Sequence, residues 1–167
     1  GRVPGQQTVL MALGKLGGRE MTASSDLDLI TVYDFDADAP QSEGPRPLYG
    51  SQYFARLTQR LISALTVQTN YGVLYPVDMR LRPSGRSGPL ATQLAGFESY
   101  QENEAWTWEH LALTRARIVS ASAPEFEARV AEVIRTALSR KRDRLALAGD
   151  VVEMRRAIAT EKGDSDR

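Results

Sequence analysis

The sequence predicts an α+β fold, with strands in the first half of the chain and helices in the second. Short apolar and β-branched runs, bounded by glycine and proline, recur over residues 8–81. A loop rich in glycine and serine follows at residues 83–89. Beyond this loop the apolar residues recur every three or four positions, which is the period of a helix. We therefore expect a strand-containing core over residues 1–90, followed by a helical subdomain over residues 91–167.

Two predicted strands open the chain. Residues 8–13 form an apolar and β-branched run that stops at Gly14, as a buried strand does where it enters a loop. Residues 26–33 alternate in character, and successive side chains of a strand point to opposite faces. Asp26 and Asp28 are therefore expected on the same face.

A third predicted strand carries another acid. Residues 73–81 return to strand character, with Asp78, Arg80 and Arg82 on one side. Pro76 has no amide hydrogen to donate, so this strand is expected at a sheet edge or a bulge. Helices are expected over residues 51–68, 94–102, 104–118, 125–145 and 151–160.

The composition excludes several classes of site. There is no cysteine among the 167 residues, and His110 is the single histidine, so thiolate zinc sites and sites built from several imidazoles are excluded. Acidic and basic side chains balance at 21 each, which argues against a nucleic-acid or anionic-membrane partner. No apolar run approaches the ~20 residues of a membrane span, and a cytoplasmic location is expected.

The three aspartates are typical of a site for hard divalent cations. Carboxylates at positions i and i+2 of a strand emerge on one face ~6.6 Å apart, close enough to bridge ions. Asp26 and Asp28 meet this requirement, and Asp78 would supply a third carboxylate that can also accept a proton. A solvated strand face is the alternative reading of the first two. Transfer of a nucleotidyl group from a triphosphate is the chemistry that needs such clustered acids.

Glycines and cations near these acids indicate where phosphate groups would bind. Gly17 and Gly18 lack side chains, so that their amides can approach phosphate oxygens, although an ordinary tight turn also explains the pair. Arg80 and Arg82 either contact phosphate or pair with the neighbouring acids. The nucleotide-binding residues predicted in this way are Lys15, Gly17, Gly18, Ser25, Arg80 and Arg82.

Four segments resemble the signature of the glutamine synthetase adenylyltransferases, a family of two-headed bacterial enzymes of nitrogen regulation. The segments are Gly14–Glu20, Ser24–Ile30, Val77–Gly85 and Tyr100–His110. The resemblance implies a polymerase-β-like nucleotidyltransferase core, with a small mixed sheet and helices, and a metal-binding triad of Asp26, Asp28 and Asp78. It also implies magnesium as the cofactor and ATP as a substrate, and a full-length enzyme much longer than this chain.

The family has two similar catalytic halves, and the resemblance favours the attaching one. That half transfers AMP from ATP to a tyrosine of glutamine synthetase, and the full-length enzyme also responds to a PII signal protein. Ser84 and the segment ending in His110 resemble the attaching half, whereas Met79 and Gly88 are closer to the removing half. The alternatives are therefore the phosphorolytic adenylyl-removing head and a non-catalytic docking module for glutamine synthetase or PII.

Overall fold

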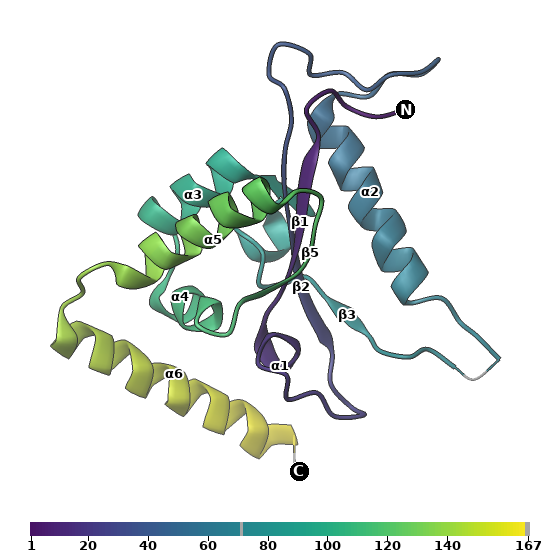
Figure 1. Cartoon of the computed structure of the whole chain (residues 1–167). Coiled ribbons are helices and arrows are strands. Elements are labelled where there is room, and N and C mark those ends of the chain that lie inside the picture. The colour runs from purple at the N-terminus through teal and green to yellow at the C-terminus, as the bar shows by residue number, and fades with distance from the viewer. Residues whose placement is uncertain (71, 166–167) are drawn as a thin grey trace.

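The computed structural model describes residues 1–70 and 72–165, and its helices lie on both sides of a mixed sheet (Figure 1). The α+β class predicted from the sequence is confirmed. In chain order the elements are β1 (Gln7–Ala12), α1 (Gly14–Gly17), β2 (Leu27–Asp34), α2 (Gly50–Leu65), β3 (Val77–Asp78), η1 (Gly85–Ser87), β4 (Ala91–Gln93), α3 (Leu94–Asn103), α4 (Thr107–Leu113), β5 (Arg117–Ala121), α5 (Pro124–Ser139) and α6 (Arg144–Ser165).

The sheet is organised around the two long strands β1 and β2. The strand order is β3-β2-β1-β5, and β4 also pairs with β2. β1 runs antiparallel to β2 and to β5, while β3 and β4 both run parallel to β2. Since β1 occupies one edge of β2, β3 and β4 share the other edge, β3 at its start and β4 further along.

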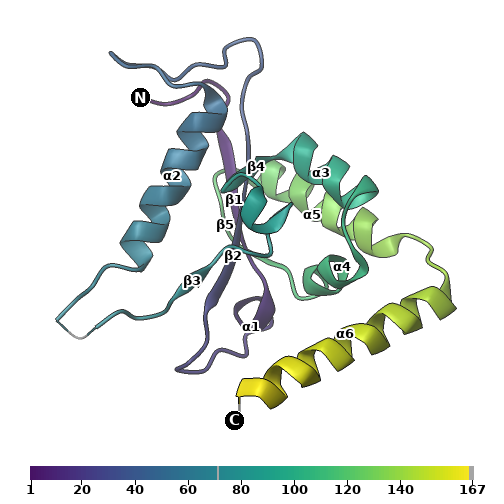
Figure 2. The same ribbon diagram turned by 180° about the vertical axis from the view of Figure 1, so that it is seen from behind.

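The helices pack against the two faces of the sheet through separate apolar clusters. α3, α4 and α5 lie on one side and α2 lies on the other, as the view from behind also shows (Figure 2). On the α2 side, the ring of Tyr33 stacks on that of Phe54 with centroids 4.3 Å apart. The larger cluster joins β1 and β2 to the other helices, and its buried members include Val9, Met11, Leu13, Ile30, Val32, Leu94, Phe97, Leu113, Phe126 and Val130.

Several predicted element boundaries are wrong, because they depend on pairing between strands that are far apart in the sequence. The strand expected over residues 73–81 is confined to β3, because the chain turns directly after it. The helix expected over residues 104–118 stops at Leu113, and β5 follows it. Strands are therefore not limited to the first half of the chain. β5 forms by pairing with β1, about a hundred residues earlier, which local periodicity does not reveal.

The division near residue 90 stays a prediction about the organisation of the chain. The structure shows that residues before and after position 90 share the larger apolar cluster. Val9 and Ile30 come before this position in the sequence, and Phe97 and Phe126 come after it. Residues before and after position 90 are thus packed together at the sheet.

The last helix, α6, lies against α4. The hydroxyl of Thr107 in α4 donates a hydrogen bond to the Asp150 carboxylate of α6. Although α6 is the longest helix of the described chain, it is too polar to be a membrane span, and the other described helices also lack the length and apolar character needed.

Candidate active site

Asp28 and Asp78 lie opposite one another at the start of β2. They are register partners in the parallel pair β2–β3, so their side chains emerge on the same side of the sheet. The register is fixed one residue earlier by the amide of Leu27, which donates to the carbonyl of Pro76 over 2.8 Å. Asp26, just before the strand, is close enough for its charge to act on Asp28. The structure therefore pairs two of the three predicted acids, Asp28 and Asp78, and places Asp26 in the segment that leads into the same strand.

Gly14 lies directly against the carboxylate of Asp28. Its φ is +53°, and a Cβ at this position would be 2.2 Å from Asp28 Oδ2. The amide of Leu13 donates to the Asp28 carbonyl over 3.0 Å and holds the two segments together. Only glycine combines this backbone conformation with this close approach. The sequence identified Gly14 as a strand end, and nothing in the local pattern revealed its contact with Asp28.

Arg80 pairs with Asp78 instead of pointing away from it. Its Nε is 2.7 Å and its Nη2 is 2.5 Å from Asp78 Oδ2, and its amide donates to Asp78 Oδ1 over 2.8 Å. The Arg80 side chain is 61% exposed, whereas that of Asp78 is 14% exposed. Of the two roles considered for Arg80, the structure shows the ion pair.

The two opposed carboxyl groups have pKa values shifted in opposite directions. Burial, followed by the charges of Asp78 and Asp26, raises the pKa of Asp28. Hydrogen bonds from Arg80 lower the pKa of Asp78 despite its partial burial. The two carboxyl groups thus differ in environment, since Arg80 neutralises the charge of Asp78 and Asp28 has no such partner among the described residues.

Arg82 is enclosed by the loop that follows β3. Its Nη1 donates to the carbonyl of Met79 over 2.7 Å and its Nε to that of Pro89 over 3.1 Å, and longer bonds reach the carbonyls of Arg86 and Gly88. Arg82 is buried, and this burial lowers its pKa. Among the described residues, no acid forms an ion pair with Arg82, and its guanidinium faces the inside of the loop. Arg82 instead fixes the shape of residues 79–89.

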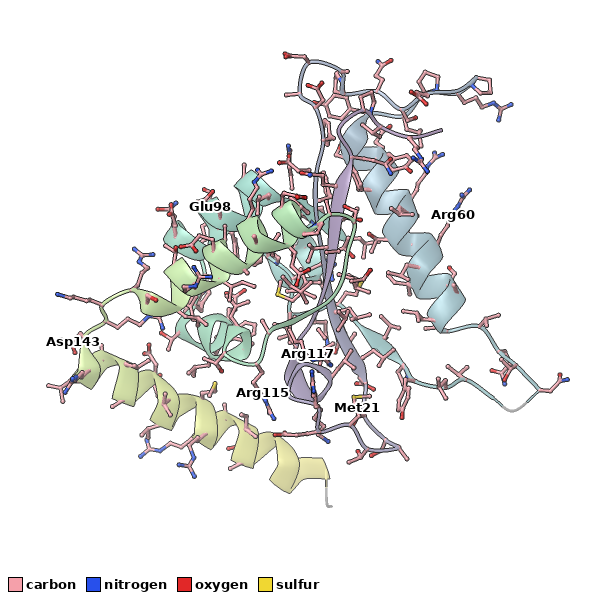
Figure 3. The ribbon with its side chains drawn as sticks, viewed as in Figure 1. Met21, Arg60, Glu98, Arg115, Arg117 and Asp143 are labelled. Carbon is pink, nitrogen blue, oxygen red and sulfur yellow. The ribbon has the colours of Figure 1, made fainter. Side chains whose placement is uncertain are left out.

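The turn formed by α1 is hydrogen-bonded to the start of β5. Arg117 donates to the carbonyls of Leu16 and Gly17 over 2.7 and 3.2 Å. Gly17 is buried, and a Cβ there would be 2.0 Å from the carbonyl oxygen of Arg115. Figure 3 shows Arg115 and Arg117 beside this turn. Gly17 is thus required by close backbone packing, while Gly18 and Lys15 are exposed.

Ser25 is buried in the turn that leads to Asp26. Its Oγ accepts a hydrogen bond from the amide of Thr22 and lies 2.9 Å from the Thr22 hydroxyl. The Ser25 amide in turn donates to the Thr22 carbonyl over 3.0 Å. In this structure Ser25 therefore orients the approach to Asp26.

Comparison with known proteins identifies the family. A family model described as glutamate-ammonia ligase adenylyltransferase matches residues 2–133. The chain belongs to this family. The bifunctional glutamine synthetase adenylyltransferase/adenylyl-removing enzyme of Rhodopseudomonas palustris is 69% identical over 166 residues, which are 99% of this chain. Enzymes with the same name from a Bradyrhizobium species and from Xanthobacter autotrophicus are 68% and 64% identical over 99% of the chain. The chain spans 17% of the length of each of these relatives.

The chain offers donor atoms that suit magnesium. Magnesium prefers carboxylate oxygens as ligands. Burial and then the charges of Asp78 and Asp26 raise the pKa of Asp28, and a bound cation would relieve the part due to charge repulsion. Among the described residues, however, no three acidic or histidine side chains converge closely enough to ligate one ion as they stand. Asp78 is turned to Arg80, and its Oδ2 would become available to a cation when this ion pair opens.

The raised pKa of Asp28 predicts how replacing it changes stability with pH. Above its folded-state pKa, the ionised Asp28 disfavours the folded chain, since the unfolded chain ionises more easily, near pH 3.8. Asp28→Asn should therefore unfold at a higher temperature than the wild type at pH 7. The gap should close as the pH falls through the folded-state pKa toward 3.8. Thermal unfolding followed by circular dichroism measures this, and a less stable variant at pH 7 would contradict the assignment.

Proposed function

We propose that this chain is an adenylylating domain that transfers AMP from ATP to a tyrosine hydroxyl of glutamine synthetase and so controls nitrogen assimilation. One observation carries the proposal: in a chain of this family, the parallel pairing of β2 with β3 sets Asp28 opposite Asp78, with Asp26 beside them. The relatives are named as bifunctional adenylyltransferase and adenylyl-removing enzymes. We place the reaction in the cytoplasm.

The three carboxylates would act as the ligands of magnesium. Ions held by Asp26, Asp28 and Asp78 would stabilise the charge that develops on the attacking and leaving oxygens. A tyrosine hydroxyl has an unperturbed pKa of ~10, so its proton needs an acceptor near neutral pH. We assign that acceptor to Asp78. Its pair with Arg80 lowers its pKa and weakens it as a base, and opening the pair would restore its basicity.

The predicted nucleotide-binding residues divide into two groups in this proposal. Lys15, Gly18 and Arg80 are exposed and can reach a phosphate directly, Arg80 after it leaves Asp78. The other three, Gly17, Ser25 and Arg82, would act by holding the surrounding backbone in place.

The partners follow from the same proposal. We propose glutamine synthetase as the protein substrate and ATP as the nucleotide donor, with a PII signal protein acting on the full-length enzyme. Residues 1–90 would carry the catalytic acids, and residues 91–167 would brace them through α3 and α5. We propose no nucleic-acid or membrane partner, because acidic and basic side chains balance at 21 each.

The main competitor is the adenylyl-removing activity on the same scaffold. The names of the relatives include both activities, and Met79 and Gly88 resemble the removing half. A removing domain would use phosphate to release ADP from adenylylated glutamine synthetase. A docking module without turnover is the other alternative, and it requires no binding of magnesium and ATP.

Two parallel assays test the assignment. The chain is incubated with magnesium, labelled ATP and unmodified glutamine synthetase, and separately with phosphate and adenylylated glutamine synthetase. We expect label to enter glutamine synthetase in the first assay and no ADP to form in the second. ADP formation alone would assign the chain to the removing half. Inactivity in both, together with no heat of binding for magnesium and ATP in calorimetry, would support the docking module.

A further inference from the structure

We propose that Arg86 is the cation that this chain presents to the phosphate groups of the nucleotide beside Asp78. The inference rests on the proposed function and adds to it a residue that binds the substrate. It comes from comparing the three arginines that follow Asp78 in the chain, which are Arg80, Arg82 and Arg86.

Two of these arginines already have partners. The guanidinium of Arg80 is bound to the Asp78 carboxylate, with contacts of 2.5 and 2.7 Å. The guanidinium of Arg82 is buried and donates to backbone carbonyls, the shortest bond being 2.7 Å to Met79. Each would have to give up hydrogen bonds before it could bind a phosphate.

Arg86 differs from both. It is exposed, and within the part of the chain that the structure describes its side chain has no ion pair or hydrogen bond. Arg82 ties the Arg86 backbone to the residue that follows Asp78, since it donates to the carbonyl of Met79 over 2.7 Å and to that of Arg86 over 3.4 Å. Arg86 therefore lies near Asp78, and its positive charge helps to lower the pKa of that carboxyl group. A free guanidinium in this position suits an anionic ligand, because it can bind two phosphate oxygens at once.

The loop that carries Arg86 is held in a defined shape. Arg82 binds the carbonyls of Arg86 and Gly88 from inside the loop. At Gly88 a Cβ would be 2.1 Å from the carbonyl oxygen of Pro83, so the two ends of the loop touch. Short 3-10 turns formed by η1 complete it. Arg86 thus projects from a preorganised backbone, which reduces the entropy lost when it binds a ligand.

A second contact fixes the same loop to the helices. The backbone of Ser84 contacts the hydroxyl of Tyr100 in α3, and this hydroxyl donates to Glu109 Oε1 over 2.9 Å. The other oxygen of Glu109 accepts the amide of Trp106 over 2.9 Å, and the Glu109 side chain is buried. The Ser84 end of the loop that carries Arg86 thus lies against Tyr100 of α3, whose hydroxyl is held by Glu109 of α4.

The test compares nucleotides that differ in their number of phosphates. Arg86→Gln and Arg86→Lys are titrated by calorimetry with ATP in the presence of magnesium, and with AMP. We expect Arg86→Gln to weaken ATP binding about tenfold, the effect of losing a hydrogen bond to a charged group, and to change AMP binding much less. Arg86→Lys should recover part of the loss, since it keeps the charge and loses the planar fork.

A matched control removes an arginine elsewhere. Arg60 is an exposed residue of α2, on the opposite side of the sheet from α3–α5 (Figure 3), and Arg60→Gln makes the same change of charge. This variant should bind ATP as the wild type does. A uniform loss in both variants would indicate a general effect of net charge and would overturn the role of Arg86.

The remaining outcomes separate the two proposals. If the wild-type chain does not bind ATP with magnesium, the proposed function fails and the role of Arg86 fails with it. If the wild type binds ATP and Arg86→Gln binds it equally well, the role of Arg86 alone is refuted. An equal loss of ATP and AMP affinity would also refute it, because phosphate recognition has to depend on the number of phosphates.

Discussion

Replacing Asp28 by asparagine is expected to lower the rate of AMP transfer by about a thousandfold or more, while the chain keeps its fold. Asp28 lies opposite Asp78 on the adjacent strand, and its pKa is raised by burial and then by its acidic neighbours. Asparagine keeps the size of the side chain and removes the charge that would bind magnesium. Incorporation of labelled AMP into glutamine synthetase measures the loss, and Asp26→Asn and Asp78→Asn should behave in the same way.

The other end of the same strand provides the control. Asp34 closes β2, where it pairs with Arg129 over 3.0 Å and accepts a hydrogen bond from Gln93 over 3.1 Å. Asp34→Asn removes the same charge from the same strand and should leave the rate of AMP transfer within about threefold of the wild type. Full activity in Asp28→Asn would refute the site, and equal losses in Asp28→Asn and Asp34→Asn would assign the effect to the strand as a whole.

Replacing Gly17 by alanine is expected to reduce the free energy of unfolding by about 3 kcal/mol and the melting temperature by roughly 10 °C. A Cβ at this position would be 2.0 Å from the Arg115 carbonyl oxygen and 2.8 Å from that of Ala12. Both neighbours are backbone atoms of β1 and of the segment entering β5, so neither can move without disturbing the sheet. Chemical denaturation gives the free energy.

Gly18 is the natural comparison, because it is the next residue and has the same chemistry. Its φ of −75° is open to any residue, and a Cβ there would meet only the flexible end of the Arg115 side chain. Gly18→Ala should therefore change the free energy of unfolding by less than about 0.5 kcal/mol. If the two variants are equally stable, close packing does not explain the glycine at position 17.

The sequence was most informative where the signal is local. The alternation around Asp26 and Asp28 depends only on the period of a strand, and the structure places both near the start of β2. The proline before β3 correctly indicated an edge position, and Asp78 lies on that edge. These features required no knowledge of which strands pair.

The features that were missed depend on contacts between distant residues. Gly14 touches Asp28, and β5 forms only because it pairs with β1. Arg82 is four residues after Asp78, so in an extended strand the two side chains would point to the same face. The chain turns after Asp78, however, and the Arg82 side chain points into the loop instead. Periodicity cannot reveal such contacts, because they are created by the tertiary fold.

β3 and β4 pair with the same edge of β2, and this arrangement affects how far Asp78 can move. β3 is attached to β2 through two residue pairs, whereas β1 is attached to it through six. The chain leaves this edge after Asp78 and returns to it at Ala91, opposite Thr31, about 10 Å further along β2. Because β4 anchors the other end of this segment, detaching β3 would shift Asp78 while Asp28 stays on β2, which β1 holds in place. Of the two paired acids, Asp78 is thus the one that a ligand could reposition without disrupting the central strands.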